Sequence, residues 1–150
     1  MNRFRIVADS SCDLLTLDGA DFVSVPLTIR TDTEEFRDDA FLDVNEMVTV
    51  LRGTGGRSYS ACPNIADWEN AFGERGDVIA FTITGSLSGS YSMACAAKKH
   101  CEELDSSRRI CVVDKETVHG LGASFIFCQC TSSQQEDVLS IDLNLRGDLD

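Results

Sequence analysis

Short apolar runs recur along the chain and predict four β-strands. Residues 5–8 form a short buried run, and residues 22–29 alternate apolar and polar side chains at the period of two that a half-buried strand requires. Pro26 lies inside the second run, and because proline has no N–H to donate, this strand should lie at an edge or contain a bulge. Residues 78–83 and 110–114 are almost wholly apolar, which is typical of strands buried on both faces of a parallel sheet.

Three other segments carry apolar side chains at the helical period. The clearest of them has apolar residues at i, i+3, i+4 and i+7, namely Val44, Met47, Val48 and Leu51. Asp43 and Glu46 resemble a capping box at its start. Asn64 is the expected N-cap of the second helix, whose apolar face contains Ile65, Trp68 and Phe72. The third helix follows a loop at 84–90 and contains Tyr91, Ala94, Cys95 and Lys98.

The alternation of strands and helices predicts an α/β fold, with a mostly parallel sheet flanked by helices in a single lobe. From residue 123 onward this pattern is lost. The part of the tail from residue 131 to residue 150 has five acidic residues and Arg146 as its one basic residue. We therefore expect a lobe over residues 1–122, followed by an atypical tail, 123–150, that is poorly ordered or loosely docked.

Composition favours one soluble domain. A chain of 150 residues with 43% hydrophobic residues can build one core. The uncharged stretch 120–135 is interrupted by polar side chains and is shorter than the roughly 20 apolar residues of a membrane span. The amino terminus enters a strand-like run without the apolar segment or cleavage site of a secretory signal. We expect no membrane span and a cytoplasmic location.

Charge and motif content exclude several partners. The net charge of −12 would repel a phosphate backbone, so nucleic acid is not an expected partner. The seven cysteines show no repeated ligand spacing and His100 and His119 are isolated, so we predict no metal site. Neither the Walker pattern nor the Gly-x-Gly-x-x-Gly fingerprint occurs, and we expect no nucleotide cofactor.

Hydroxyl-rich loops mark the expected position of a ligand. In an open α/β sheet the loops at the carboxyl ends of the strands form the ligand crevice, which selects residues 9–11, 58–63 and 84–90. The last of these loops precedes a helix, so its free backbone N–H groups suit a carboxylate. A capped turn with glycines for tight geometry is the structural alternative.

His119 provides a catalytic alternative. A serine nucleophile needs a histidine that is itself oriented by a carboxylate, and His119 is the candidate partner of Ser86 or Ser88. Such an arrangement would make the chain a small hydrolase or phosphoryl-transfer enzyme. His119 also fits an ordinary turn or helix start, and we expect the chain not to be an enzyme.

Five motifs, taken in order, resemble the DegV family of fatty-acid-binding proteins. They are Ile-Val-Ala-Asp-Ser-Ser-Cys-Asp-Leu at 6–14, Val-Pro-Leu at 25–27, Ser-Ala-Cys-Pro at 60–63, Leu-Ser-Gly-Ser-Tyr at 87–91 and Val-Asp-Lys-Glu-Thr at 113–117. The resemblance implies the amino-terminal lobe of a two-lobed protein that clasps a long-chain fatty acid. The acyl tail would lie in an apolar tunnel, with hydroxyl groups binding the carboxylate at its mouth. Some members present this carboxylate to a fatty acid kinase.

By motif position, the resemblance implies that Ser60, Ser88 and the N–H of Gly89 bind the head group. Each group donates one hydrogen bond, and a carboxylate also favours the positive end of a helix dipole. Ala61 stands where many members have a second hydroxyl, which would weaken this contact. The predicted function is therefore binding of a long-chain fatty acid for a partner kinase, without catalysis.

The chain stops where the family continues into its second lobe. Residues 123–150 do not resemble the start of that lobe, as in a truncated or frame-shifted reading. The alternative function is therefore an inert or interaction fragment that binds no lipid by itself. In either case the apolar wall that would face the other lobe is exposed, which favours weak self-association.

Overall fold

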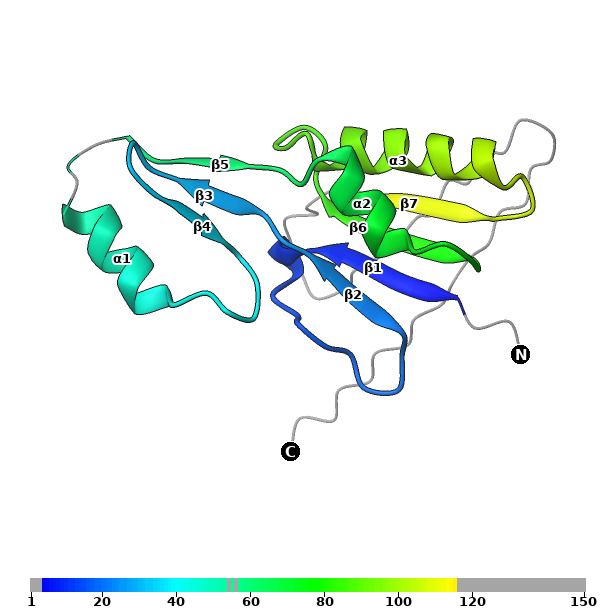
Figure 1. The fold of residues 1–150 in the computed structure, drawn as a ribbon, viewed down its shortest axis with the longest axis horizontal. Coiled ribbons are helices and arrows are strands. Elements are labelled where there is room, and N and C mark those ends of the chain that lie inside the picture. The colour runs from blue at the N-terminus through cyan, green and yellow to red at the C-terminus, as the bar shows by residue number, and fades with distance from the viewer. Residues whose placement is uncertain (1–3, 54, 56, 116–150) are drawn as a thin grey trace, which may run out of the picture.

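A four-stranded parallel sheet forms the body of the molecule in the computed structural model, which describes residues 4–53, 55 and 57–115. Its strand order is β2-β1-β6-β7 (Figure 1), and all neighbouring strands run parallel. The strands are β1 (Arg5–Asp9), β2 (Phe22–Val25), β6 (Val78–Ile83) and β7 (Ile110–Lys115). The apolar run at 78–83 thus forms a central strand, as the sequence predicts.

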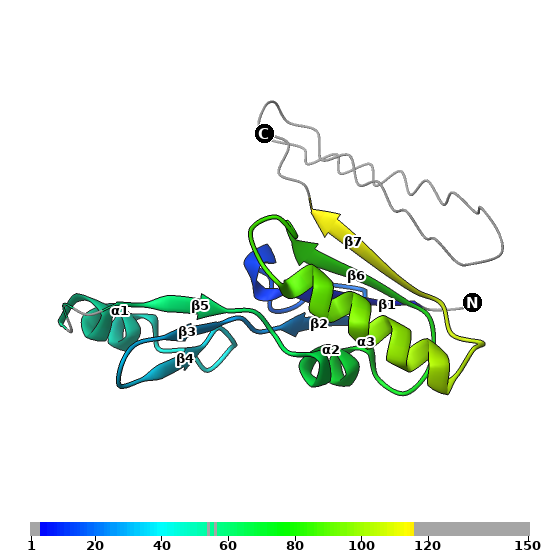
Figure 2. The same cartoon turned by 90° about the horizontal axis from the view of Figure 1, so that it is seen from above.

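Two helices cover one face of this sheet and enclose the core. Helices α2 (Ile65–Phe72) and α3 (Ser90–Leu104) lie side by side on that face (Figure 2). Trp68 and Phe72 of α2 have no exposed surface and pack with sheet residues that share one face. Those sheet residues are Val7, Val25, Val78, Ala80, Ile110 and Val112. Ala94 and Ala97 are fully buried, because small side chains let α3 approach the sheet closely.

The start of α2 is capped as predicted. The side chain of Asn64 accepts a hydrogen bond from the Asp67 N–H, and the carboxylate of Asp67 accepts one from the Asn64 N–H, both at 3.0 Å. This reciprocal pair satisfies two N–H groups that a helix start leaves without partners. The helix ends at Gly73, whose φ of 69° lies in the left-handed region that glycine adopts readily.

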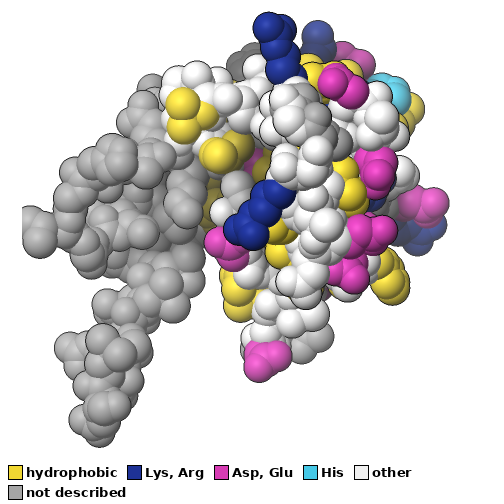
Figure 3. Space-filling view, turned by 90° about the vertical axis from the view of Figure 1, so that its left-hand side faces the viewer, with side chains coloured by type: hydrophobic (Ala, Val, Ile, Leu, Met, Phe, Trp, Pro, Cys, Tyr) yellow, Lys and Arg dark blue, Asp and Glu magenta, His cyan; other side chains and the backbone are white. Residues whose placement is uncertain are grey.

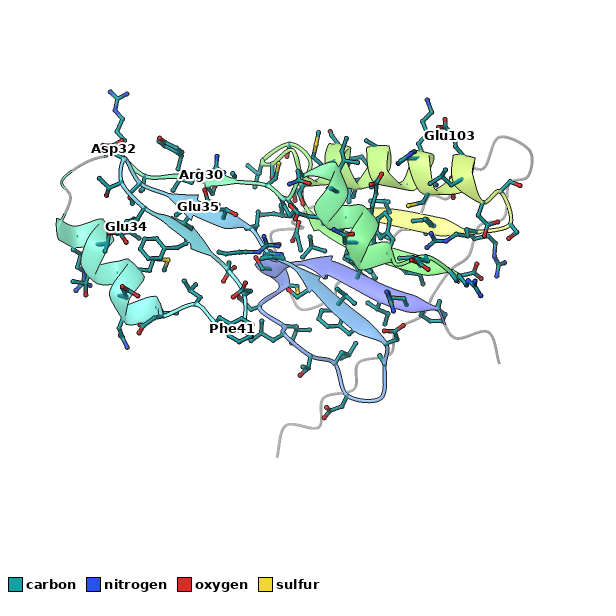
Figure 4. The ribbon with its side chains drawn as sticks, in the orientation of Figure 1. Arg30, Asp32, Glu34, Glu35, Phe41 and Glu103 are labelled. Carbon is teal, nitrogen blue, oxygen red and sulfur yellow. The ribbon has the colours of Figure 1, made fainter. Side chains whose placement is uncertain are left out.

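A second, smaller sheet projects from one end of the first and was not predicted from the sequence. It is antiparallel, with the order β4-β3-β5. Its strands are β3 (Thr28–Arg30), β4 (Glu35–Arg37) and β5 (Tyr59–Ala61). Figure 4 shows Arg30, Asp32, Glu34 and Glu35 at the end of the β3–β4 hairpin that lies away from the parallel sheet. Arg30 and Glu35 form an exposed ion pair at 2.8 Å.

The single strand predicted at 22–29 is wrong, because the chain forms two strands in two different sheets. The break falls at Pro26 and Leu27, between β2 and β3. Pro26 cannot donate to a strand ladder, and the Leu27 N–H donates instead to the Ser10 hydroxyl at 3.0 Å. The sequence signal for an edge or a bulge therefore marks the transfer of the chain from one sheet to the other.

Helix α1 (Val44–Gly53) is confirmed, but none of its residues is buried. Asp43 caps it by accepting the N–H groups of Asn45 and Glu46, each at 3.0 Å. Val44 on its apolar side is 55% exposed, and Phe41 in the preceding loop is 94% exposed. Figure 3 looks onto this end of the molecule and shows hydrophobic side chains at the surface among charged ones.

The other sequence predictions fall partly beyond the described residues. Strand β7 and helix α3 occur where expected, and the loop after β1 contains a 3-10 turn, η1 (Ser10–Cys12). The tail 123–150 and the end of the predicted lobe, 116–122, lie outside the described residues, as does His119.

Candidate ligand-binding site

The loops at the carboxyl ends of β1 and β6 meet at a buried carboxylate. Asp9 closes β1 and is 1% exposed. One of its oxygens, Oδ2, accepts hydrogen bonds from the Ile83 N–H at 2.9 Å and from the Ser90 hydroxyl at 2.6 Å. The other oxygen, Oδ1, accepts one from the Ser11 hydroxyl. The loop 9–11 and the loop 84–90 are therefore brought together, as the position of both loops at strand ends predicts.

The loop 84–90 is also held at its beginning. The Gly85 N–H donates to Asp114 Oδ1 at 2.8 Å, and Asp114 lies at the carboxyl end of β7. Within the loop, the N–H groups of Leu87 and Ser88 donate to the Thr84 carbonyl at 2.9 and 3.2 Å. Asp114 thus binds the beginning of the loop and Asp9 binds its end, while backbone hydrogen bonds within the loop fix its middle.

Ser88 and Gly89 are the last residues of this loop before α3. Ser88 is partly buried and Gly89 is exposed. The Ser88 hydroxyl oxygen accepts the N–H of Ser90 at 3.2 Å. Since that N–H approaches the oxygen, the hydroxyl proton of Ser88 must be donated in another direction. Both this proton and the Gly89 N–H, at the positive end of the helix dipole, suit an anionic ligand.

The segment that follows Ser60 contacts the loop that carries Ser88. Ser60 is an exposed residue of β5, where it pairs with Ile29. Two residues later, Cys62 lies so close to Gly89 that a β-carbon on that glycine would stand 3.1 Å from the Cys62 sulfur. The structure therefore brings together the two segments selected from the sequence. That Ser60 and Ser88 bind one carboxylate remains a prediction.

Tyr91, in the first turn of α3, lies beside the start of the loop. A β-carbon on Gly85 would stand 3.4 Å from the Tyr91 β-carbon. The hydrogen bond with the Cys95 side chain raises the pKa of the Tyr91 phenol above its ordinary value, and the charge of Asp114 adds to this shift. The phenol therefore remains protonated at neutral pH and adds no negative charge beside the loop.

Two open grooves among the described residues lie away from Ser60 and Ser88. One, of about 280 Å³, runs between the loop after η1 and the loop before α1. Its walls combine Leu14, Leu15 and Leu42 with the carboxylates of Asp13, Asp38 and Asp39. The other, of about 250 Å³, lies between β2 and α2. The acidic walls of the first groove do not suit an anionic head group. Neither groove is lined by the predicted site residues.

The sequence analysis missed the roles of Asp9 and Asp114. Asp9 was selected only as part of the loop 9–11, although its carboxylate binds groups 74 and 81 residues further along the chain. The sequence did contain a signal for both roles. Asp9 and Asp114 each lie at the carboxyl end of an apolar strand, where the loops that leave a parallel sheet come together. Such a residue is in a position to bind the N–H groups of neighbouring loops.

Neither a metal site nor a membrane span is found in the part of the chain that the structure describes. No group of three or more histidine, cysteine, aspartate or glutamate side chains there is arranged to hold a metal ion. Among the helices of that part, none combines the length and the hydropathy needed to cross a bilayer.

Known proteins resemble this chain over most of its length. A DegV domain-containing protein of Streptococcus pneumoniae is 39% identical over 121 residues, which cover 78% of this chain and 43% of that protein. A DegV domain-containing protein of Streptococcus gordonii is 38% identical over 122 residues, with the same shares. The chain thus spans less than half the length of the curated relatives it matches.

Solved structures agree with these relatives. The crystal structure of a DegV family protein from Eubacterium eligens, loaded with heptadecanoic acid, matches with 45% identity and a TM-score of 0.73, over 75% of this chain and 41% of that one. The fatty acid kinase B3 protein of Streptococcus pneumoniae, loaded with linoleic acid, matches with 39% identity and a TM-score of 0.72, over 75% and 42%. The family profile described as uncharacterised protein, DegV family, matches residues 3–136. The chain therefore belongs to the DegV family.

Proposed function

We propose that this chain binds a long-chain fatty acid and does not transform it. The observation that carries the proposal is the contact between the Cys62 segment and Gly89, because it brings together two hydroxyl-bearing segments that each adjoin the end of a strand. Relatives with 45% and 39% identity were solved with heptadecanoic acid and linoleic acid, which supports the same ligand class here.

The carboxylate of the fatty acid is bound by the hydroxyl groups of Ser60 and Ser88 and by the N–H of Gly89. All three groups lie on residues that are exposed or partly exposed, so a ligand reaches them without rearrangement of the core. A charged acceptor strengthens each hydrogen bond, and the dipole of the 15-residue helix α3 favours the negative charge. The site contains donors for an anion and no nucleophile is assigned to it.

A fatty acid kinase is the partner that we propose, acting in the cytoplasm. The relative from Streptococcus pneumoniae is named as a fatty acid kinase B3 protein, which supports this class of partner. A head group that lies at the exposed mouth of the site, next to Gly89, is accessible to a second protein. Incubation of the loaded chain with such a kinase and ATP should yield ADP in proportion to the bound acid.

A second candidate is a lobe that binds no lipid by itself. Two observations favour it. The chain covers 43% of its curated relatives, and neither of the two open grooves described above is lined by Ser60 or Ser88. On this second proposal, the described residues contribute only the head-group end of the site, and the walls for the acyl tail belong to another part of the protein.

Binding of heptadecanoic acid tests the proposal directly. Isothermal titration of the 150-residue chain should show saturable binding, with weaker binding of the methyl ester because an ester carries no charge. Ser88→Ala and Ser60→Ala should each weaken binding of the acid by roughly tenfold, as expected for the loss of a charge-assisted hydrogen bond. Ser92→Ala, on an exposed position of α3, is the matched control and should bind as the unsubstituted chain does.

Native mass spectrometry separates the two candidates. A carrier purified without added lipid should retain acyl chains, and a non-binding lobe should have the bare mass of 16.4 kDa. A bare mass combined with no binding in the titration would reject the proposed function.

We also propose weak self-association through the exposed apolar residues around α1. Phe41 is 94% exposed and Val44 is 55% exposed. Since the chain carries a net charge of −12, repulsion opposes contact between copies at low salt, whereas at 0.1 M salt the repulsion between charges more than about 10 Å apart is largely screened. Light scattering after size exclusion should show more dimer at high salt and less dimer for Phe41→Ser. A concentration-independent monomer under both conditions would contradict this.

A further inference from the structure

The buried carboxylate of Asp9 connects three segments that are distant in the sequence. It lies at the end of β1, yet it accepts the Ile83 N–H at the end of β6 and the Ser90 hydroxyl at the start of α3. The Ser11 hydroxyl occupies its other oxygen. Asp9 is 1% exposed, so these protein groups take the place of water around its charge.

These contacts decide in which direction the neighbouring hydroxyl groups donate. Ser90 has no exposed surface and its hydroxyl proton is donated inward, to Asp9. The N–H of Ser90 donates to the Ser88 oxygen at 3.2 Å. Ser88 therefore acts as an acceptor toward the helix, and its own proton is available on the side away from Ser90. A series of hydrogen bonds thus connects Asp9 to Ser88 through Ser90, which donates its hydroxyl proton to Asp9 and its N–H to Ser88.

We infer that Asp9 is a positioning residue of the head-group site: through Ser90 it fixes the start of α3, so that Ser88 and Gly89 present donors to a carboxylate. This inference rests on the proposed function, since the ligand is the fatty acid head group. Asp114 holds the other end of the same loop through Gly85, at 2.8 Å. The loop is thus fixed at both ends by carboxylates and exposes donors in between.

Substitutions of Asp9 can distinguish its role in positioning the loop from the effect of its negative charge. Asp9→Asn keeps one oxygen, which can still accept from Ile83 and Ser90 while the amide donates to the Ser11 hydroxyl. Asp9→Ala removes every acceptor and leaves the Ile83 N–H and the Ser90 hydroxyl without their partner. Ser90→Ala removes only the link from Asp9 to α3. If Asp9 acts by positioning the loop, Asp9→Asn should retain the preference for the acid over its ester that Asp9→Ala loses.

The experiment measures how well the 150-residue chain distinguishes heptadecanoic acid from its methyl ester. Asp9→Ala and Ser90→Ala should reduce the ratio of the two affinities by roughly tenfold, and Asp9→Asn should retain most of it. Val78→Ala is the control, because Val78 is buried at the opposite end of β6 from Ile83 and its loss weakens the fold without reaching the loop. A ratio that falls equally in Val78→Ala, or that survives in both Asp9→Ala and Ser90→Ala, overturns the inference.

A measurement without ligand keeps this inference distinct from the proposed function. If the unsubstituted chain binds neither compound, the proposed function fails. Amide hydrogen exchange then tests the positioning role alone. In Ser90→Ala, the milder of the two substitutions, exchange at Ser88 and Met93, whose N–H groups donate to the Thr84 and Gly89 carbonyls, should accelerate more than exchange at Ala97 in the middle of α3. Equal changes along the helix would show that Asp9 and Ser90 do not position the loop.

Discussion

The close approach of Gly89 to Cys62 gives the sharpest test of how the two halves of the site are assembled. Gly89 has φ −70°, which any residue can adopt, so Gly89→Ala introduces no backbone strain. The new β-carbon would stand 3.1 Å from the Cys62 sulfur, and one of the two segments must move by a few tenths of an ångström. The substitution therefore probes the contact between the segments and little else.

The expected size of the effect follows from two opposing contributions. Overpacking of this kind costs about 1–3 kcal/mol, whereas replacing glycine stabilises the fold by about 0.4–1 kcal/mol through the unfolded chain. Gly89→Ala should therefore lower the free energy of unfolding by about 1 kcal/mol. In a Cys62→Ala background the sulfur is absent, and the same substitution should raise it by about 0.5 kcal/mol.

Urea denaturation followed by the fluorescence of Trp68 measures all four members of this cycle. Trp68 is the single tryptophan and has no exposed surface, so its emission reports the loss of the core. The coupling between the two substitutions should be about 1–2 kcal/mol. If Gly89→Ala has the same effect in both backgrounds, within about 0.5 kcal/mol, the two segments do not touch and the reasoning behind the site is refuted.

Two further predictions concern the packing of the helices. Arg108 is 7% exposed and donates to the carbonyl groups of Phe72 at 3.1 Å and Gly76 at 3.2 Å, so Arg108→Met should lower the free energy of unfolding by about 2 kcal/mol in urea denaturation. A loss under about 0.5 kcal/mol would contradict this. The contact with Glu69 raises the pKa of His100 above its ordinary 6.5, so this pair stabilises the fold fully below pH 6.5 and the effect is lost as pH rises through the raised pKa. His100→Gln should therefore lower the melting temperature at pH 5.5 and leave it unchanged at about pH 9; a difference that grows with pH would count against it.

The strands of the parallel sheet could be predicted because their residues must be apolar. Strand β6 lies between two neighbours and its side chains are buried or partly buried, which requires the run at 78–83. The cap of α2 was predictable for a local reason, since Asn64 and Asp67 are three residues apart and bind each other's N–H groups. Both signals lie within a few residues of the feature that they specify.

The small sheet could not be predicted in the same way. Strands β4 and β5 have three residues each, too few for a period to be recognised, and none of their residues is fully buried. They are held by backbone pairing with β3, and such pairing leaves no mark on side-chain identity. Helix α1 is the opposite case. The helical spacing of its apolar residues is clear in the sequence, although none of its residues is buried.

The two halves of the candidate site belong to different sheets, and the junction between these sheets decides how they meet. Only Pro26 and Leu27 separate β2 from β3, and the Leu27 N–H is bound by Ser10, the residue after Asp9. Because β5 pairs with β3, the position of Ser60 follows from this junction. Ser88 is instead fixed by the parallel sheet, through the carboxylates that hold its loop. A shift of the small sheet should therefore change the separation of the two hydroxyl groups without disturbing the core, which makes the junction the part of the fold that sets the width of the candidate site.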